Sequence, residues 1–408
     1  MMNDGVSFKR IEASYCGKIG KSPNGTELMR LQNYFLAWST DILGKEKSSN
    51  VELITVFSLK VMPCIIRDVN FNVNFLVWDN HFWHLYGLFL LSVKKYYNSP
   101  NSNEHVAAEK ELKSILLLYL SCRFDEVPSL SRYIAEEYAL LEASSFAYDR
   151  PYWLSDELLF SGNSGAYSVA CMFGLCHELG HIAFREKIGI ASEIKEKLIN
   201  YCEVQLKLMQ LNEEVDQALG RYETAPPIQK KIIHRLLDNR NNHFFEEICC
   251  DIIAIVMIAQ SFSLEGYSEE AIIGLIGLLQ SFFCFDWWRS TNEKMWKMYS
   301  DVYNDPIKND FAFIDPEHQY YRYDESISED LSYRMNIPLG CASTILGFEL
   351  TNEVSAKTRD EFLPIIEQVN CYDLVEKVMI HYQRSHKDYD SQIKHRKRRD
   401  ELIGWRRN

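Results

Sequence analysis

The stretch CHELGHIAF, residues 176–184, places two histidines and a glutamate inside a run of apolar residues. His177 and His181 are four positions apart, so on an α-helix their side chains project from one face. Two imidazoles at this spacing can hold one zinc ion, and Glu178 can reach a water on that ion without being a ligand. The stretch therefore predicts a helical metal site with a base beside it.

The residues around this motif are apolar on nearly every side of the expected helix, which we place at about residues 166–187. A loop, SGNSG at residues 161–165, is expected before it. Buried imidazoles and carboxylates without partners are costly, and a bound metal would remove that cost. The structural alternative is a pair of hydrogen-bonded core histidines with Glu178 as their partner.

A third ligand is needed, because two histidines and a water leave one position of a tetrahedral zinc site open. The apolar segment HFFEEICCDIIAIVMIA, in a helix expected at about residues 242–259, contains Glu247 and Asp251 four positions apart. Carboxylates in such surroundings need buried partners. These partners could be the predicted metal site or, alternatively, a nearby arginine or lysine.

Together, HELGH at residues 177–181 and EICCD at residues 247–251 resemble the gluzincin clan of zinc metallopeptidases. The segment EEICCDIIA is similar to the E-E-x-x-A-D-x-x-A helix of the Ste24/HtpX-like and ImmA/IrrE-like groups, with Cys250 where that pattern has alanine. The 66-residue spacing from His181 to Glu247 is nearer that of the Ste24/HtpX group. The resemblance covers these two helices only.

This resemblance implies that His177, His181 and Glu247 are zinc ligands and that Asp251 accepts a hydrogen bond from the non-ligating nitrogen of His177. It implies that Glu178 is the general base, taking a proton from the zinc-activated water and returning it to the departing amine. The implied protein is a soluble, cytoplasmic zinc endopeptidase. It would cleave a narrow range of protein or peptide substrates under regulation, as in stress response or phage defence.

Peptidases of this clan also use a Tyr, His or Arg to stabilise the oxyanion. The segment EHQYYRYDESISEDLSYRMNI, residues 317–337, offers His318 first and Arg334 second. Related peptidases carry a His-Pro…Arg element at this chain position, and Gln319 stands where that element has proline. For most tyrosines of the segment, aromatic surface packing is the alternative.

Composition sets the class of protein. The 408 residues are 47% hydrophobic and 25% charged, which is typical of a globular chain, and a net charge of −13 argues against a surface that coats nucleic acid. The 11 cysteines form no C-x-x-C pair, which argues against a cysteine-only zinc site and favours free thiols in a reducing cytoplasm. The most apolar windows, residues 75–93 and 271–285, predict core rather than membrane spans.

The expected fold is mainly α (α+β), with a zincin-like helical core and a small N-terminal β-containing region. We expect a mixed region at residues 1–95, the helical metallopeptidase core at 96–345, and a helical C-terminal region at 346–408. FNVNFLVW, residues 71–78, alternates like a strand with one buried face. EEAIIGLIGLLQSFFCF, residues 269–285, predicts one helix.

Two further segments leave alternatives open. A coiled-coil-like stripe over residues 191–223 predicts either a helix docked along the body or a lid or partner-binding arm. The basic C-terminal cluster RKRR at residues 396–399 is either a solvated end or a contact for nucleic acid or anionic lipid. The rival functions are therefore a non-catalytic zinc-fold regulatory protein and a nucleic-acid-associated factor with a structural metal.

Three further histidines are candidate ligands by residue type, namely His243, His81 and His84. His243 is expected at the start of its helix, near the mouth of the site, because its neighbours are polar. His81 and His84 have no carboxylate at ligand spacing and are expected to be structural.

Overall fold

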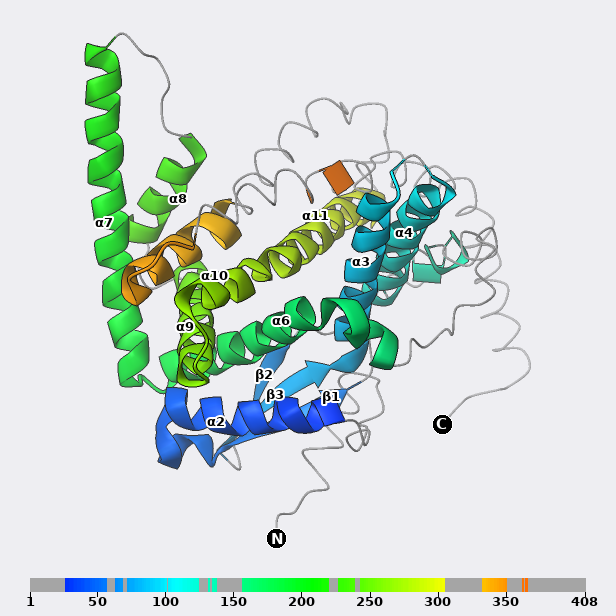
Figure 1. Ribbon diagram of the computed structural model, residues 1–408, viewed down its shortest axis with the longest axis horizontal. Coiled ribbons are helices and arrows are strands. Elements are labelled where there is room, and N and C mark those ends of the chain that lie inside the picture. The colour runs from blue at the N-terminus through cyan, green and yellow to red at the C-terminus, as the bar shows by residue number, and fades with distance from the viewer. Residues whose placement is uncertain are drawn as a thin grey trace. The chain divides into compact units, whose positions relative to one another are not determined.

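The computed structural model describes residues 26–56, 63–68, 72–100, 102–124, 131–132, 134–137, 156–219, 227–238, 243–304, 332–350, 362 and 364–365. Of these described residues, 83% are helical, and a three-stranded sheet lies near the start of the chain (Figure 1). The expectation of a mainly α chain with a small N-terminal β region is confirmed.

The sheet consists of β1 (Val51–Val56), β2 (Cys64–Asp68) and β3 (Val73–Asp79) in the order β1-β3-β2. The central strand β3 is parallel to β1 and antiparallel to β2. All seven residues of β3 are buried, so the prediction of one buried face is wrong. Asn74 is tolerated inside because its side-chain oxygen accepts a hydrogen bond of 3.1 Å from Arg185.

In chain order, the labelled helices of the described residues are α2 (Thr26–Ser48), which precedes the sheet, α3 (Asn80–Asn98), α4 (Asn103–Arg123), α6 (Asp156–Arg185), α7 (Gly189–Ala218), α8 (Pro227–Asp238), α9 (His243–Leu264), α10 (Glu269–Gly277) and α11 (Leu279–Asn304). A further helix occupies residues 332–346.

Two expected boundaries are wrong. Residues 161–165 are helical and belong to α6, which begins at Asp156 instead of after a loop. Packing overrides weak helix propensity here: a Cβ on Gly165 would lie 3.1 Å from Leu278, so glycine allows a close approach. The single helix expected over residues 269–285 is instead divided at Leu278, and the first piece is N-capped by Ser268.

The core beside the sheet is aromatic and holds α6 in place. Trp83 stacks on Trp78 with ring centroids 4.5 Å apart and on Phe282 at 5.3 Å. A Cβ on Gly174 would lie 2.9 Å from the Trp83 side chain, so glycine lets α6 pass close to this stack without displacing the indole.

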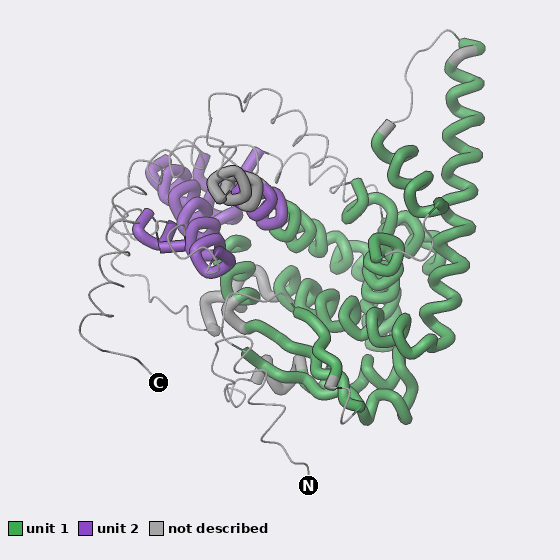
Figure 2. Tube along the Cα trace, turned by 180° about the vertical axis from the view of Figure 1, so that it is seen from behind, with its two compact units in different colours: residues 1–90, 154–287, 314–363 green, residues 91–153, 288–313, 364–408 purple. Residues whose placement is uncertain are grey.

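The chain divides into two compact units (Figure 2). Unit 1 contains residues 1–90, 154–287 and 314–363, and therefore the sheet, α6 and α9. Unit 2 contains residues 91–153, 288–313 and 364–408; inside it, Arg289 donates hydrogen bonds to Tyr119 (2.8 Å) and Glu293 (3.0 Å). The expected domain boundaries at residues 95 and 345 stay predictions.

Among the described residues, His243–Leu264 and Glu269–Lys294 are long and apolar enough to cross a membrane by length and composition alone. The buried shares of their most apolar windows are 72% and 67%. Buried core helices of soluble proteins meet the same criterion, so these two helices are weak evidence for membrane association.

Candidate metal centre

The two histidines of the quoted stretch lie on one face of α6, as their spacing predicts. Their ring centroids are 5.0 Å apart, and the rings are nearly perpendicular. The neighbouring Cys176 and Leu179 are buried, so α6 is a core helix at this point. The side chains of His177 and His181 keep 11% and 14% of their surface accessible to solvent.

Helix α9 crosses α6 at Gly180. A Cβ on Gly180 would lie 3.1 Å from Cys250 Sγ and 3.2 Å from both Cα and Cβ of Cys250. Glycine on one helix and a small residue on the other therefore allow the backbones to approach closely. This crossing brings Glu247, one turn before Cys250, next to the two imidazoles.

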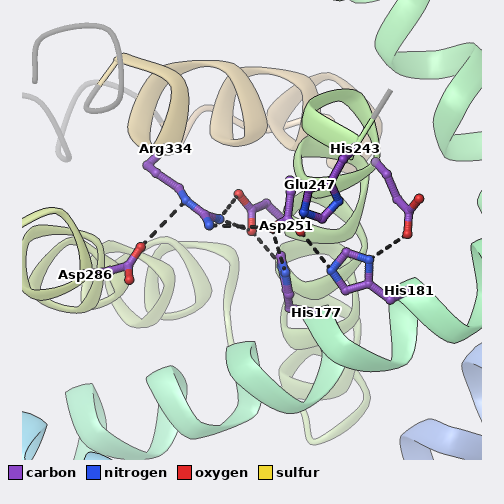
Figure 3. A network of polar contacts seen from close by, with 8 residues as sticks. His177, His181, His243, Glu247, Asp251, Asp286 and Arg334 are labelled. Atoms are coloured by element: carbon purple, nitrogen blue, oxygen red, sulfur yellow. Dashed lines mark hydrogen bonds and ion pairs between the residues drawn. The ribbon is translucent and has the colours of Figure 1, made fainter. Parts of the chain in front are cut away.

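The three expected ligands converge (Figure 3). Glu247 Oε2 lies 3.3 Å from His177 Nε2, and Glu247 Oε1 lies 3.2 Å from His181 Nε2. The ligand atoms of all three residues lie within 4.8 Å of one another, so the group could hold a metal ion. Burial raises the pKa of Glu247, but contacts with both imidazoles outweigh it and hold the pKa well below its usual range.

Each imidazole has a carboxylate at its other nitrogen. Asp251 Oδ1 lies 2.7 Å from His177 Nδ1, an ion-pair contact. Glu246 Oε1 lies 2.7 Å from His181 Nδ1 and forms a hydrogen bond with it. Both carboxylates favour the tautomer that leaves Nε2 free to face Glu247.

The contact between Glu246 and His181 was not predicted from the sequence. Its only signal was the doubled glutamate in EEICCD, residues 246–251. Glu246 also forms a second group with His181 and Cys250 whose atoms are close enough to hold a metal. That group shares His181 with the first one, so both belong to the same centre.

The charges of the two acids set the protonation of His177. Burial lowers the pKa of His177, but the charges of Asp251 and Glu247 act against it and raise the pKa to about 10. Burial also lowers the pKa of His181, but its contacts with Glu247 outweigh burial and raise the pKa above its ordinary value. Both imidazoles therefore hold a proton strongly unless another cation takes its place.

Arg334, expected as a second choice for the oxyanion, comes from the helix at residues 332–346 and contacts Asp251. Its Nη1 donates to both carboxylate oxygens of Asp251, at 2.7 and 2.6 Å. Its Nη2 lies 3.7 Å from Glu247, and its Nε lies 3.8 Å from Asp286 (Figure 3). The guanidinium thus balances the negative charge of the fully buried Asp251.

Glu178 belongs to the same electrostatic neighbourhood. Burial raises its pKa to about 7, while the charges of His177 and His181 lower it and that of Glu247 raises it. A carboxyl with this pKa can both take up and release a proton near neutral pH.

His243 starts α9, as expected, and is 82% exposed. Its Nε2 lies 3.4 Å from Glu247 Oε1, but it is not among the residues whose ligand atoms converge. His318 and the basic cluster at residues 396–399 lie outside the described residues. Most cysteines in the described parts of the chain are buried.

No family model, curated protein or solved structure matches this chain. The resemblance to gluzincins therefore depends on the residues of α6 and α9 alone.

Proposed function

We propose that this chain is a zinc-dependent endopeptidase with a zincin-like helical core. The observation that carries the proposal is the convergence of His177 Nε2, His181 Nε2 and the carboxylate of Glu247. These atoms come from two helices that are more than 60 residues apart in the chain, as the 66-residue spacing shows. Their convergence is therefore a property of the fold and not of local spacing.

The donor set fits zinc. Two imidazole nitrogens and one carboxylate oxygen are the three protein ligands of many catalytic zinc sites, which keep a further position for water or substrate. In a tetrahedron with arms of about 2.0–2.1 Å, ligand atoms are about 3.3–3.4 Å apart. Each Nε2 lies at about this distance from one oxygen of Glu247: 3.3 Å from Oε2 for His177 and 3.2 Å from Oε1 for His181. The two contacts involve different oxygens, so they support the closeness of the three donors.

When bound, zinc would polarise a peptide carbonyl and lower the pKa of a water molecule. Glu178 would take a proton from the attacking water and give it to the amine that leaves when the peptide bond breaks. Its pKa of about 7 suits both transfers. The solvent-accessible share of the Glu247 side chain, 20%, leaves the centre open to water on one side.

Asp251 and Glu246 would act as positioning residues. Each holds one imidazole by Nδ1 and so directs Nε2 toward Glu247. Arg334 would hold Asp251 in turn, and its contribution to oxyanion stabilisation stays a prediction, as does that of His318. The substrate class, a protein or peptide cleaved in the cytoplasm under regulation, is part of the proposal.

Metal content tests the ligand set. Full-length wild type purified without chelators should contain about one zinc per chain by mass spectrometry, and Glu247→Ala should lose it. His243→Ala is the matched control, because this histidine also contacts Glu247 but is exposed and outside the ligand group. Equal zinc in wild type and Glu247→Ala would contradict the proposal.

Glu178→Gln separates an enzyme from a binding protein. The variant should keep zinc, because Glu178 is not in the ligand group, and should lose cleavage of proteins in a cell lysate. Cleavage that survives in Glu178→Gln would contradict the assigned base. Full zinc occupancy with no cleavage in either protein would favour the non-catalytic regulatory or nucleic-acid-associated alternatives.

A further inference from the structure

Helix α7 has two apolar faces. The inner face is buried and consists of Ile194, Leu198, Cys202 and Met209. The outer stripe consists of aliphatic residues that are between 47% and 61% exposed, namely Val204, Leu208, Leu211, Val215 and Leu219. The described part of the stripe expected over residues 191–223 is therefore split: its first half docks on the body, and its second half, as far as Leu219 just after α7, faces solvent.

The outer stripe follows the spacing of a helix-pairing surface. Val204, Leu208, Leu211 and Val215 are separated by steps of four, three and four, which are the steps between the a and d positions of a heptad. Single exposed aliphatic residues are common on protein surfaces. A continuous row at this spacing is the pattern that a second helix covers.

No described element covers this row. Helix α8 packs on the other side of α7, where Lys230 contacts both carboxylate oxygens of Glu213 at 3.0 Å. Helix α7 lies at the edge of unit 1, and its C-terminal end extends beyond α8 in both views (Figures 1 and 2).

We infer that the outer stripe is the interface of a homodimer in which α7 pairs antiparallel with α7 of a second copy. With the two-fold axis between Met209 and Gln210, Leu208 faces Leu211 of the partner subunit. In the same register, Val204 faces Val215 of the partner subunit. An isologous contact of this kind needs only one self-complementary surface.

The charges beside the stripe select this orientation. Lys207 and Glu214 are exposed and lie on the same side of the outer stripe. In an antiparallel pair, Lys207 of one copy lies next to Glu214 of the other. By symmetry the Lys207–Glu214 contact occurs twice. On the other flank, Gln205 would lie near Asn212 of the partner subunit. A parallel pair would instead place Lys207 beside an asparagine and Glu214 beside Leu219, with no ion pair.

The size of the surface sets the expected affinity. Five half-exposed aliphatic side chains and their flanking residues on each copy would bury about 1,000 Å² in total, near the lower limit for a specific interface. We therefore expect a reversible dimer with a dissociation constant of about 1–100 µM.

Sedimentation of the full chain tests the interface. The wild-type mass should rise from 47.8 kDa toward twice that value as concentration increases, and Leu211→Glu should keep it at 47.8 kDa. The matched control is Leu264→Glu, an exposed leucine at the end of α9 that should leave association unchanged. A wild type that stays at 47.8 kDa up to about 200 µM would overturn the inference.

Charge exchange tests the register. Lys207→Glu or Glu214→Lys alone should weaken the dimer about ten- to thirtyfold, because each places two like-charge pairs across the interface. The double exchange should restore association, and an equimolar mixture of the two single variants should do so as well. Failure of both rescues would overturn the antiparallel pair, since a stripe covered by the protein's own chain or by a different protein cannot respond to mixing. Zinc content plays no part in this outcome, so it is independent of the proposed peptidase activity.

Discussion

Replacing Gly180 with alanine should weaken zinc binding far more than it lowers stability, because this residue sets the distance between α6 and α9. The new Cβ would lie 3.1 Å from Cys250 Sγ and 3.2 Å from Cys250 Cα. Carbon atoms in ordinary contact are about 3.5–4.0 Å apart, so the two helices must separate by a few tenths of an ångström. The backbone Cα cannot rotate away as a side-chain end could.

Two effects on stability oppose each other. Overpacking costs about 1–3 kcal/mol, and alanine is about 1 kcal/mol better than glycine inside a helix. The free energy of unfolding should therefore fall by only about 0–2 kcal/mol. Metal binding has no such compensation, because ligand distances tolerate only about 0.2 Å, and Glu247 moves with α9. We expect zinc affinity to fall about ten- to a hundredfold.

Competition with a chelator measures the zinc affinity, and urea unfolding measures stability. Gly174→Ala is the matched control on the same helix: its Cβ would lie 2.9 Å from the Trp83 side chain, and its nearest atoms belong to Trp83 and Trp78 instead of α9. This variant should lose stability and keep its zinc affinity. Equal losses of zinc affinity in the two variants, or no loss in Gly180→Ala, would refute the reasoning.

The two Nδ1 partners should respond differently to neutralisation. Asp251→Asn should lower the free energy of unfolding by about 3–5 kcal/mol in urea, since it removes the fully buried anion that both Arg334 and His177 contact. Glu246→Gln should lower it by less than about 1 kcal/mol because Glu246 is 37% exposed. Stability should also depend on pH after zinc is removed by a chelator. The pKa of His177, about 10 in the folded chain, lies above the value of 6.5 expected after unfolding, so its contribution is complete below pH 6.5 and is lost as pH rises toward 10. Zinc-loaded protein should not show this loss, because ligated imidazoles are neutral, and thermal unfolding from pH 6 to about 10 with and without zinc distinguishes the two cases.

Much of the secondary structure near the site could be predicted from local pattern. The apolar periodicity around the HELGH and EICCD motifs predicted the end of α6 and the start of α9 to within a few residues. The beginning of α6 was wrong, because Ser161–Gly165 reads as a loop while packing extends the helix back to Asp156. The burial of both faces of β3 was also missed, because Asn74 looks like a solvent-facing residue until its partner Arg185 is known.

The closeness of the three candidate ligands was predicted better than the contacts around them. His177 and His181 share a face through local helical geometry, and the apolar setting of Glu247 signalled that it needs a buried partner. The contacts of Glu246 with His181 and of Arg334 with Asp251 join residues 65 and 83 positions apart, and the local sequence does not say which partner either residue meets.

The sequence by itself determined which side chains each helix can present together, because spacing of four along an α-helix decides this whatever the rest of the chain does. It thereby settled the face shared by His177 and His181 and the one shared by Glu247 and Asp251. Only the tertiary structure decided that these faces meet, that Gly180 and Cys250 set their separation, and that the outer stripe of α7 is left exposed. These outcomes depend on which surfaces pack against each other, and packing is a property of pairs of helices that neither helix carries alone.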